Sequence, residues 1–531
     1  MSTTLPDLVR EVAERTPGAP ALYHRDRTLS YAELDAAIDR TAHGLRALAL
    51  QPDERVAVYL PKRPEAVIAL FAAQRASGVA VPINPVLKAH QVGHILRDCG
   101  VRALVTAPGR LTALTPALAT CPALGHVILV DETGDGPPAH DTCKHWSWSA
   151  VQEASGGDDL PERLESDLAA LLYTSGSTGR PKGVMLSHRN LLVGAASVAG
   201  YLANRPDDRL LATLPLSFDY GLSQLTTAFH AGASVALFDY LLPGDLFTAL
   251  DRYGITGVAG VPPLWNQLAA LPWPEAAVRH LRYITNSGGA LPRPTLARLQ
   301  EALPATDIYL MYGLTEAFRS TYLPPSELGR RPDSIGRAIP NAEVSVVRPD
   351  GSECAVDEPG ELVHRGPLVA LGYWNDPERT AERFRAAPGR PSGLLHTERA
   401  VWSGDQVRRD AEGYLYFVGR ADEMIKSSGY RVSPTEIEEV AYTAETVTQA
   451  VAFGVPDPML GEAIVLVVEA DREQLSPATL LTHCRRHLPP FMMPQAVDVT
   501  TELPCGANGK IDRKAVAARY RTSVSATEVE A

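Results

Sequence analysis

The sequence predicts an α/β protein with largely parallel sheets, and three observations support this fold class. Up to about Pro340, short apolar segments alternate with stretches of helical length, which is typical of layered α/β structures. After Pro340, short strands follow one another through tight turns such as Pro349-Asp350-Gly351, which indicates antiparallel pairing. The residues after Arg420 have helices and strands of their own, so a separate, smaller α+β unit is expected at the C-terminal end.

Two helices of the first part have local sequence signals. Ser30 and Glu33 have capping-box spacing at the start of a helix expected over residues 31–48, and Pro64 begins a second helix expected over 64–75. Strands are expected at residues 55–60, 79–83, 103–106, 126–130, 168–173, 234–238, 257–261, 282–285, 307–311, 343–348, 361–365, 413–418 and 463–469. Further helices are expected at residues 221–230, 434–442 and 476–487.

The composition is that of a folded, acidic protein. The chain has 531 residues, with 50 Lys and Arg against 62 Asp and Glu, a formal net charge of −12. Hydrophobic residues make up 45% and charged residues 21%, which excludes a mostly disordered chain. The acidic balance argues against nucleic acid as the main partner, because nucleic acids are normally bound by basic surfaces. It still allows a nucleotide, which needs only a local site.

No segment of the sequence suits a membrane or secretion. The longest apolar run, Ala66 to Ala73, is far shorter than the ~20 residues of a membrane helix. The N-terminus carries acidic residues early and has no cleavage signal, so we expect a cytoplasmic protein without membrane insertion. The six cysteines are scattered, without CxxC pairs or metal-ligand spacing, and are expected to be reduced.

A segment rich in glycine and hydroxyl residues follows the strand expected at 168–173. It runs from Thr174 to Val184 and contains three glycines, four Ser or Thr residues, one Arg and Lys182. Backbone amides and hydroxyls in such a loop can surround phosphate oxygens. It is not a Walker loop, because Gly183 follows Lys182 where that motif needs Ser or Thr.

This segment resembles the phosphate-binding loop of the adenylate-forming superfamily, which includes acyl-CoA synthetases, adenylation domains of nonribosomal peptide synthetases and beetle luciferases. Four further stretches match the family's motifs in the same order, so the resemblance covers nearly the whole chain. It implies a large N-terminal domain of layered α/β subdomains with a β-barrel-like subdomain, residues 1–420, and a small mobile C-terminal domain, residues 421–531. The hinge is expected near Asp422.

The resemblance also implies a site for ATP and Mg²⁺. In this family the loop that binds phosphate corresponds here to Thr174, Ser175, Gly176, Ser177, Thr178 and Lys182. The adenine is expected between the turn at Gly288, Gly289 and Ala290 and the segment Tyr312-Gly313-Leu314-Thr315-Glu316. There Tyr312 would stack on the base, Thr315 would meet the α-phosphate and Glu316 would bind the metal, a hard ligand for a hard cation.

Four further residues acquire expected roles from the resemblance. Asp405 would accept both ribose hydroxyls and Arg420 would contact the nucleotide. Lys510 would be the catalytic lysine of the first half-reaction, and Lys426 would act in the second. Thr174 and Glu316 complete the expected catalytic set. In the first step a carboxylate attacks the α-phosphorus of ATP and releases pyrophosphate, and in the second a thiol attacks the acyl-AMP.

The expected acyl pocket departs from the acyl-CoA synthetase pattern. Ser217 and Phe218 stand where many of those enzymes have Phe-His, and Ser-Phe-Asp resembles the amino-acid-activating branch, in which the Asp pairs with the substrate's amine. Asp219 is therefore expected either to bind an amine or another polar group of a substrate, or to cap the helix at 221–230. Arg319 is expected either to bind an anionic group or to pair with an acidic side chain.

The sequence thus predicts an AMP-forming ligase for a small carboxylic acid, with CoA or the phosphopantetheine of an acyl-carrier protein as acceptor. Two alternatives remain within the same superfamily: activation of nitrite or a similar oxyanion for transfer to an amine, and amino-acid adenylation for a carrier protein. A third, of a different class, is a non-catalytic nucleotide-binding protein. The presence of Thr174, Lys182, Glu316, Asp405 and Lys510 argues against the third.

Overall fold

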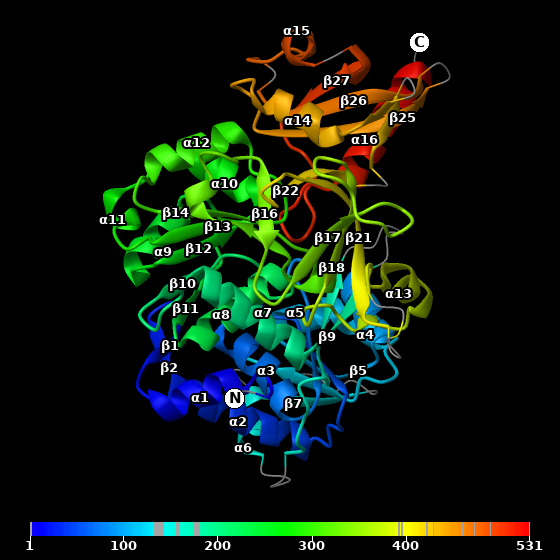
Figure 1. The fold of residues 1–531 in the computed structure, drawn as a ribbon. Helices are drawn as coiled ribbons and strands as arrows, with labels where there is room; N and C mark the ends of the chain where they lie inside the picture. Colours follow the sequence, from blue (N-terminus) through cyan, green and yellow to red (C-terminus); the bar gives the residue numbers. More distant parts are fainter. Residues whose placement is uncertain are drawn as a thin grey trace.

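The structure of the chain is a computed structural model (Figure 1). It describes residues 3–131, 143–154, 160–174, 181–390, 393, 397–420, 423–427, 430–457, 460–471, 473–488 and 490–529. None of the helices in this part of the chain is long and apolar enough to cross a membrane. The strands lie in three sheets of eight, fourteen and five strands.

The eight-stranded sheet has the order β19-β9-β8-β4-β3-β5-β6-β7. Its strands are β3 (Arg55–Val58), β4 (Val79–Pro82), β5 (Val101–Thr106), β6 (His126–Leu129), β7 (Lys144–Ser147), β8 (Leu168–Thr174), β9 (Lys182–Ser187) and β19 (Gly372–Tyr373). All pairs from β8 to β7 are parallel, whereas β9 is antiparallel to both β8 and β19. The glycine-rich segment therefore connects two antiparallel neighbours, and its flanks Thr174 and Lys182 are register partners.

The fourteen-stranded sheet is parallel at one end and antiparallel at the other. Its parallel strands are β1 (Pro20–His24), β10 (Arg209–Ala212), β11 (Ser234–Leu237), β12 (Gly257–Gly260), β13 (Tyr283–Asn286) and β14 (Asp307–Tyr312), with β2 (Arg27–Ser30) antiparallel at the edge. The antiparallel strands are β15 (Thr321–Leu323), β16 (Ser334–Ala338), β17 (Glu343–Val347), β18 (Gly360–Arg365), β20 (Phe384–Ala386), β21 (Arg399–Arg409) and β22 (Leu415–Arg420). The expected change to antiparallel strands after Pro340 is confirmed, although it already begins at β15.

Helices cover both of these sheets (Figure 1). They are α1 (Asp7–Arg15), α2 (Tyr31–Ala47), α3 (Pro64–Arg75), α4 (Ala89–Asp98), α5 (Pro108–Leu118), α6 (Trp148–Glu153), α7 (His188–Tyr201), α8 (Asp219–Ala231), α9 (Asp245–Tyr253), α10 (Pro262–Ala269), α11 (Glu275–Val278), α12 (Arg293–Ala302) and α13 (Pro377–Arg383), with short 3₁₀ turns η1 (Thr315–Ala317) and η2 (Pro325–Glu327).

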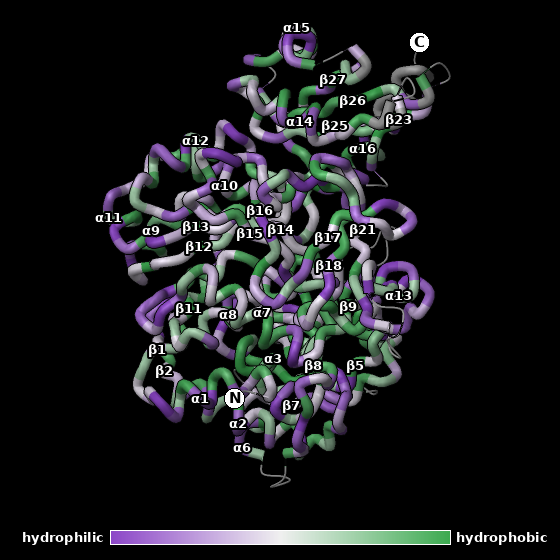
Figure 2. Tube along the Cα trace, in the orientation of Figure 1, coloured by the Kyte–Doolittle hydropathy of each residue, from purple (hydrophilic) through white to green (hydrophobic). Residues whose placement is uncertain are grey.

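One hydrophobic core joins the two large sheets. Every residue of α3 except Glu65 is buried, which is expected of a helix that is apolar all round. Its side chains pack in a single cluster with residues of α8 and of strands from both sheets. Figure 2 shows these inner segments as hydrophobic, whereas α11 and α13 at the periphery are hydrophilic. The core fixes the two sheets relative to each other, and so fixes residues that come from both.

The third sheet lies above the other two in Figure 1, close to the C-terminus. It contains β23 (Ile425–Ser427), β24 (Tyr430–Val432), β25 (Gln449–Asp457), β26 (Gly461–Glu469) and β27 (Ala496–Thr500). Around it are α14 (Pro434–Tyr442), α15 (Pro477–His487), η3 (Pro490–Met492) and α16 (Arg513–Val529). It has its own hydrophobic core, which includes Ile437, Leu466 and Leu480. The division at residue 420 and the hinge at Asp422 stay predictions, and Asp422 lies outside the described residues.

Most of the predicted elements are confirmed. The helix expected at residues 31–48 is α2, and its capping box is present because Ser30 accepts from the Glu33 amide while Glu33 accepts from the Ser30 amide. The predicted helices at 64–75 and 434–442 coincide with α3 and α14. The helix expected at 221–230 begins earlier, at Asp219. The described cysteines are free, and five of the six are buried.

Candidate active site

A lysine, a glutamate and a tyrosine meet where the eight-stranded sheet approaches η1. The Nζ atom of Lys182 lies 3.0 Å from Glu316 Oε1 and donates to the Tyr373 hydroxyl at 2.7 Å. That hydroxyl donates in turn to Glu316 Oε1 at 2.6 Å. Burial opposes the charge of Glu316, but Lys182 and Tyr373 outweigh it and lower the pKa of this carboxyl. The cluster thus holds a charged pair beside the glycine-rich segment.

Tyr373 carried no sequence signal, because a single aromatic residue after a glycine is ordinary. Strand β19, which holds it, has only two residues and pairs with β9, and the register places Tyr373 opposite Val184. Its ring also lies 3.9 Å from Lys182 Nζ. Of the predicted phosphate-binding residues, Ser175, Gly176, Ser177 and Thr178 lie outside the described residues. Thr174 is described, and its Oγ1 atom is buried without a hydrogen-bond partner.

A second cluster combines residues of three strands of the fourteen-stranded sheet. Asp405 on β21 and Arg420 on β22 are register partners, with Arg420 Nη1 3.2 Å from Asp405 Oδ1. The hydroxyl of Tyr312, the last residue of β14, donates to Asp405 Oδ2. Burial raises the pKa of Asp405, although Arg420 and Tyr312 act against this effect. The three residues predicted for adenine, ribose and nucleotide binding are therefore brought together.

Asp219 is buried beside Thr315, which lies between Tyr312 and Glu316 in the sequence. It is the first residue of α8, and Phe218 occupies the N-cap position without a side-chain cap. The Asp219 side chain instead accepts from Thr315 Oγ1 at 3.1 Å. The expectation that Asp219 caps the helix is therefore wrong, and the reason is that α8 begins two residues earlier than predicted. Burial raises the pKa of Asp219, while the nearby positive charges of Arg319 and Lys510 partly offset this rise.

Lys510 enters the same site from the C-terminal part of the chain. Its Nζ atom lies 5.0 Å from the centre of the Phe218 ring. A Cβ atom at Gly288, whose φ is +85°, would lie 2.6 Å from Lys510 Cε, so this glycine makes room for the lysine. Burial lowers the pKa of Lys510, and Asp219 and Asp405 act in the opposite direction.

A short turn holds Lys510 in place. Gly506 donates its amide to the Lys510 carbonyl at 2.6 Å, Cys505 and Ile511 form an isolated bridge, and Gly509 has a φ of +75°. We call residues 505–511 the lysine turn. Asn84, two residues after β4, donates Nδ2 to the carbonyl of Ala507 at 2.7 Å. A polar residue in an apolar stretch after a strand has many ordinary explanations, so sequence reasoning missed Asn84.

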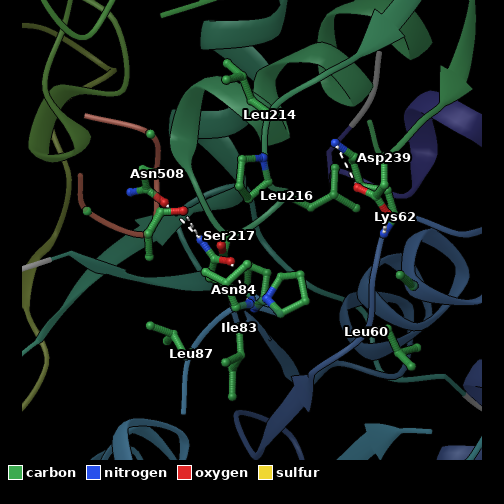
Figure 3. A pocket seen from close by; sticks show the side chains of 18 of the residues that line it. Leu60, Lys62, Ile83, Asn84, Leu87, Leu214, Leu216, Ser217, Asp239 and Asn508 are labelled. Atoms are coloured by element: carbon green, nitrogen blue, oxygen red, sulfur yellow. Dashed lines mark hydrogen bonds and ion pairs between the residues drawn. The ribbon is translucent and has the colours of Figure 1, made fainter. Parts of the chain in front are cut away.

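A cavity of about 580 Å³ separates the lysine turn from the large sheets. Its walls are mostly apolar and include Leu60, Leu214 and Leu216, while Asn508 belongs to the opposite side. Figure 3 shows Asn84 facing Asn508 and, across the cavity, Lys62 paired with Asp239. Lys62 Nζ lies 3.1 Å from Asp239 Oδ1 and donates to the carbonyl of Thr213 at 2.7 Å.

The remaining predicted residues are placed as follows. Gly289 and Ala290 are exposed beside Gly288, and Gly313 packs against Arg319, whose Cα atom would lie 3.1 Å from a Cβ at this glycine. Arg319 is buried and donates Nη1 to Ser287 Oγ at 3.2 Å. Lys426 lies on β23, and its side chain is outside the described part. Within the described residues, no group of three or more His, Cys, Asp or Glu side chains could hold a metal.

Comparison with known proteins identifies the class. Residues 9–374 match the AMP-binding enzyme family and residues 436–510 match the AMP-binding enzyme C-terminal domain. The chain therefore belongs to the AMP-binding enzymes, the adenylate-forming superfamily, as its motifs indicated.

Three relatives illustrate this membership. The chain is 33% identical over 519 residues to a feruloyl-CoA synthase from Amycolatopsis sp., covering 96% of this chain and 97% of that protein. It resembles the ATP-bound MatB from Rhodopseudomonas palustris with a TM-score of 0.85 and 27% identity, covering 97% and 99% of the two chains. It also resembles the O-succinylbenzoate coenzyme A synthetase from Bacillus subtilis in complex with ATP and a magnesium ion, with a TM-score of 0.80, 26% identity and coverage of 96% and 98%.

Proposed function

We propose that this protein is an AMP-forming acid–thiol ligase, which uses ATP and Mg²⁺ to convert a small carboxylic acid into its acyl-AMP and then transfers the acyl group to the thiol of CoA. The observation that carries the proposal is the convergence of Lys510, the Lys182–Glu316–Tyr373 cluster and the Tyr312–Asp405–Arg420 cluster around Asp219 and Thr315. Membership of the family supports the same reaction class.

The first half-reaction brings two anions together, so the protein's task is to position them and to balance charge. Asp405 offers a carboxylate to the ribose hydroxyls, with Arg420 beside it. The buried Thr174 hydroxyl, which has no hydrogen-bond partner, is a donor for phosphate oxygens. Lys510 is the mobile positive charge for the attacking carboxylate and the α-phosphate, where charge accumulates as pyrophosphate departs.

Glu316 suits a magnesium ion. Mg²⁺ in nucleotide sites is usually held by one or two carboxylates together with phosphate oxygens, so a cluster of three acidic residues is not required. Lys182 and Tyr373 engage only Oε1 of Glu316, which leaves Oε2 for a ligand. The ion, when bound, neutralises charge on the phosphates and polarises the bond that breaks.

The cavity behind the lysine turn supports the second half-reaction. Its volume of about 580 Å³ lies in the range of small-molecule sites. Ser217, whose Oγ is buried without a partner, lines it and directly precedes Phe218 and Asp219. We infer that the acceptor thiol approaches the acyl-AMP from this side, on a flexible arm that is either part of CoA or carried by a protein. Withdrawal of the lysine turn would open the route.

Asp219 favours a substrate with an amine. It is buried, it accepts one hydrogen bond from Thr315, and no cation of the described residues forms an ion pair with it within 4.0 Å. A buried carboxylate of this kind is stabilised by a positively charged group. We propose that the ammonium of an amino acid supplies that group. A panel in which plain acids outperform their amino analogues would contradict this assignment.

The reaction class can be tested by measuring the release of AMP and pyrophosphate. Candidate acids would be incubated with ATP and Mg²⁺, with and without CoA, a phosphopantetheinylated carrier protein, or nitrite plus an aryl amine. We expect acid-dependent pyrophosphate exchange without an acceptor and AMP release only with a thiol. Turnover that requires nitrite and an amine would show that the thiol is not the acceptor. Pyrophosphate exchange that persists unchanged in Lys510→Ala would contradict the proposed site.

A further inference from the structure

Arg319 is a buried cation whose hydrogen-bonding capacity is largely unused. It is 2% exposed and donates only Nη1, to Ser287 Oγ, while Nε and Nη2 are buried without a partner. These two nitrogens form one edge of the guanidinium, the parallel pair of donors that binds a carboxylate in bidentate fashion. No carboxylate of the described residues occupies that edge.

The backbone before Arg319 is strained in a way that directs this side chain inward. Phe318 has φ +55° and ψ −49°, and the amide of Arg319 donates to the carbonyl of Ala317 at 2.6 Å, which is a γ-turn of the rare, strained form. The Phe318 ring fills the space at Gly194, where a Cβ atom would lie 2.4 Å from it. Such strain persists only where packing enforces it, and it concentrates at functional sites.

The surroundings of the guanidinium suit a small polar group. The Tyr220 ring lies 4.6 Å from the Arg319 Cζ atom, and a void of about 20 Å³ is lined by Arg319, Ser223, Gln224 and Thr285. The Oε1 atom of Gln224 is also without a partner. As it stands, the void has room for one water, which could accept a hydrogen bond but could not balance the charge, so a carboxylate requires the side chains around the void to move apart. A long chain or an aromatic ring does not fit there.

Other cations of the site have acidic partners within the protein, and Arg319 differs from them. Lys182 is paired with Glu316 and Arg420 with Asp405. The charges of Arg319 and Lys510 both act on the Asp219 carboxyl, but Asp219 forms an ion pair within 4.0 Å with neither of them. The hydrogen bond of Asp219 is made to Thr315 and not to Arg319. An arginine held in place by strain, without a carboxylate partner of its own, needs an anion from outside the chain.

From this geometry we propose that the acid carries, besides the carboxylate that reacts, a second anionic group that binds the Nε–Nη2 edge of Arg319. This inference rests on the proposed function and specifies its substrate class: a short acid with two anionic groups. With an amine at Asp219, the best substrate has the charge pattern of an acidic α-amino acid. Arg319 is then a specificity-determining residue that touches the non-reacting end of the substrate.

The test is ATP–pyrophosphate exchange with matched acids that differ only in the second charge. Suitable pairs are aspartate and asparagine, glutamate and glutamine, succinate and butanoate, and glutarate and pentanoate. We expect kcat/KM to favour the doubly anionic member by at least about tenfold, the size of a charge-assisted hydrogen bond. In Arg319→Met this preference should disappear because kcat/KM falls for the anionic member alone. Arg319→Lys, which keeps the charge but lacks the bidentate edge, should be intermediate.

A matched variant separates recognition from stability. Arg331 is also a buried arginine beside a tyrosine ring, but it is paired with Glu327, Asp410 and Glu412. Arg331→Met should lower the melting temperature and leave the preference among acids unchanged. Arg319→Met should lower the melting temperature less than Arg331→Met, because Arg319 has one hydrogen bond and no ion pair within 4.0 Å, whereas Arg331 has three acidic partners.

The outcomes distinguish a failure of the proposed function from a failure of the inference about the second anionic group. If none of these acids supports exchange, the inference is overturned, whereas the proposed function fails only if the wider panel of candidate acids is inactive as well. If neutral acids exchange as well as their anionic partners, only the inference is overturned. A loss of activity in Arg319→Met that is equal for every acid and accompanied by a lower melting temperature would show a structural role and would also overturn it.

Discussion

Two lysines reach the same site, and the structure holds them in opposite ways. Lys182 begins a buried strand and is paired with Glu316 at 3.0 Å and with the Tyr373 hydroxyl at 2.7 Å. Lys510 comes from the C-terminal turn, lies over the Phe218 ring and is held indirectly, through the contact of Asn84 with Ala507. One lysine is fixed in the scaffold, and we propose that the other can leave. This difference suits an enzyme that needs the second lysine in only one of two steps.

The largest effect is expected from removal of the mobile lysine. Lys510→Ala should lower the rate of pyrophosphate exchange by about 10²- to 10³-fold, because a preorganised donor at the developing charge is lost. Transfer from purified acyl-AMP to CoA should be affected much less. Lys514→Ala, four residues further on, is the control and should retain activity. Equal losses in both half-reactions would contradict the distinction between the two lysines.

A methyl group at Gly288 should displace Lys510 without removing it. The added Cβ would lie 2.6 Å from Lys510 Cε, and the φ of +85° disfavours alanine as well. Gly288→Ala should therefore reduce pyrophosphate exchange by about 10- to 100-fold, with a small loss of stability.

Gly289→Ala is the matched control for this change, because its Cβ would meet only a Pro262 side-chain atom at 3.2 Å. If the two alanine variants lose the same activity, space for Lys510 is not the reason.

The fixed lysine should be less sensitive to a small change in its partners. Tyr373→Phe removes the hydroxyl that bridges Lys182 and Glu316 but leaves their direct contact at 3.0 Å. We expect kcat/KM for ATP to fall by about tenfold and the free energy of unfolding to fall by about 1 kcal/mol, as for one buried hydrogen bond. Chemical denaturation and steady-state kinetics measure the two effects. An unchanged KM for ATP and Mg²⁺ would show that this cluster does not face the phosphates.

A weaker effect is expected where the lysine turn docks. Asn84→Ala removes the hydrogen bond to the Ala507 carbonyl and should slow exchange by about two- to tenfold, the size of one net hydrogen bond. Transfer from purified acyl-AMP should stay constant or become faster, because the docked arrangement is no longer favoured. The melting temperature serves as the control for folding. A reduction of both half-reactions would indicate that Asn84 supports the site in another way.

The smallest effect is expected in the pH dependence of pyrophosphate exchange. Burial lowers the pKa of Lys510, so its protonated form is lost at a lower pH than the value of about 10.4 for an ordinary lysine. The rate of pyrophosphate exchange should therefore fall as the pH rises through this lowered pKa. Lys510→Arg keeps its charge over the accessible range, so whatever activity it retains should lack this alkaline fall. An identical profile for both proteins would assign the fall to another group.

The sequence predicted those features that depend on local pattern or on residues grouped in one segment. The capping box at Ser30 belongs to this kind. The sequence also predicted site roles for Asp219, Thr315 and Lys510, but only the fold shows that these residues lie close together. Tyr373, Asn84 and Lys62 escaped notice because their importance depends on partners more than 100 residues away. The positive φ of Phe318 could not be predicted either, since its ring packs against Gly194, which is far away in the sequence.

The shape of the lysine turn affects how much conformational entropy would be lost each time Lys510 docks in the site. Its internal bond from Gly506 to the Lys510 carbonyl and the left-handed Gly509 shape the tip within residues 505–511 alone. A tip that is already shaped loses little conformational entropy on docking, so the return resembles the association of two rigid surfaces rather than the folding of a loop. The rate of the catalytic cycle would then depend on how fast the whole C-terminal unit reaches the docked position. The ordering of the lysine turn itself would contribute little.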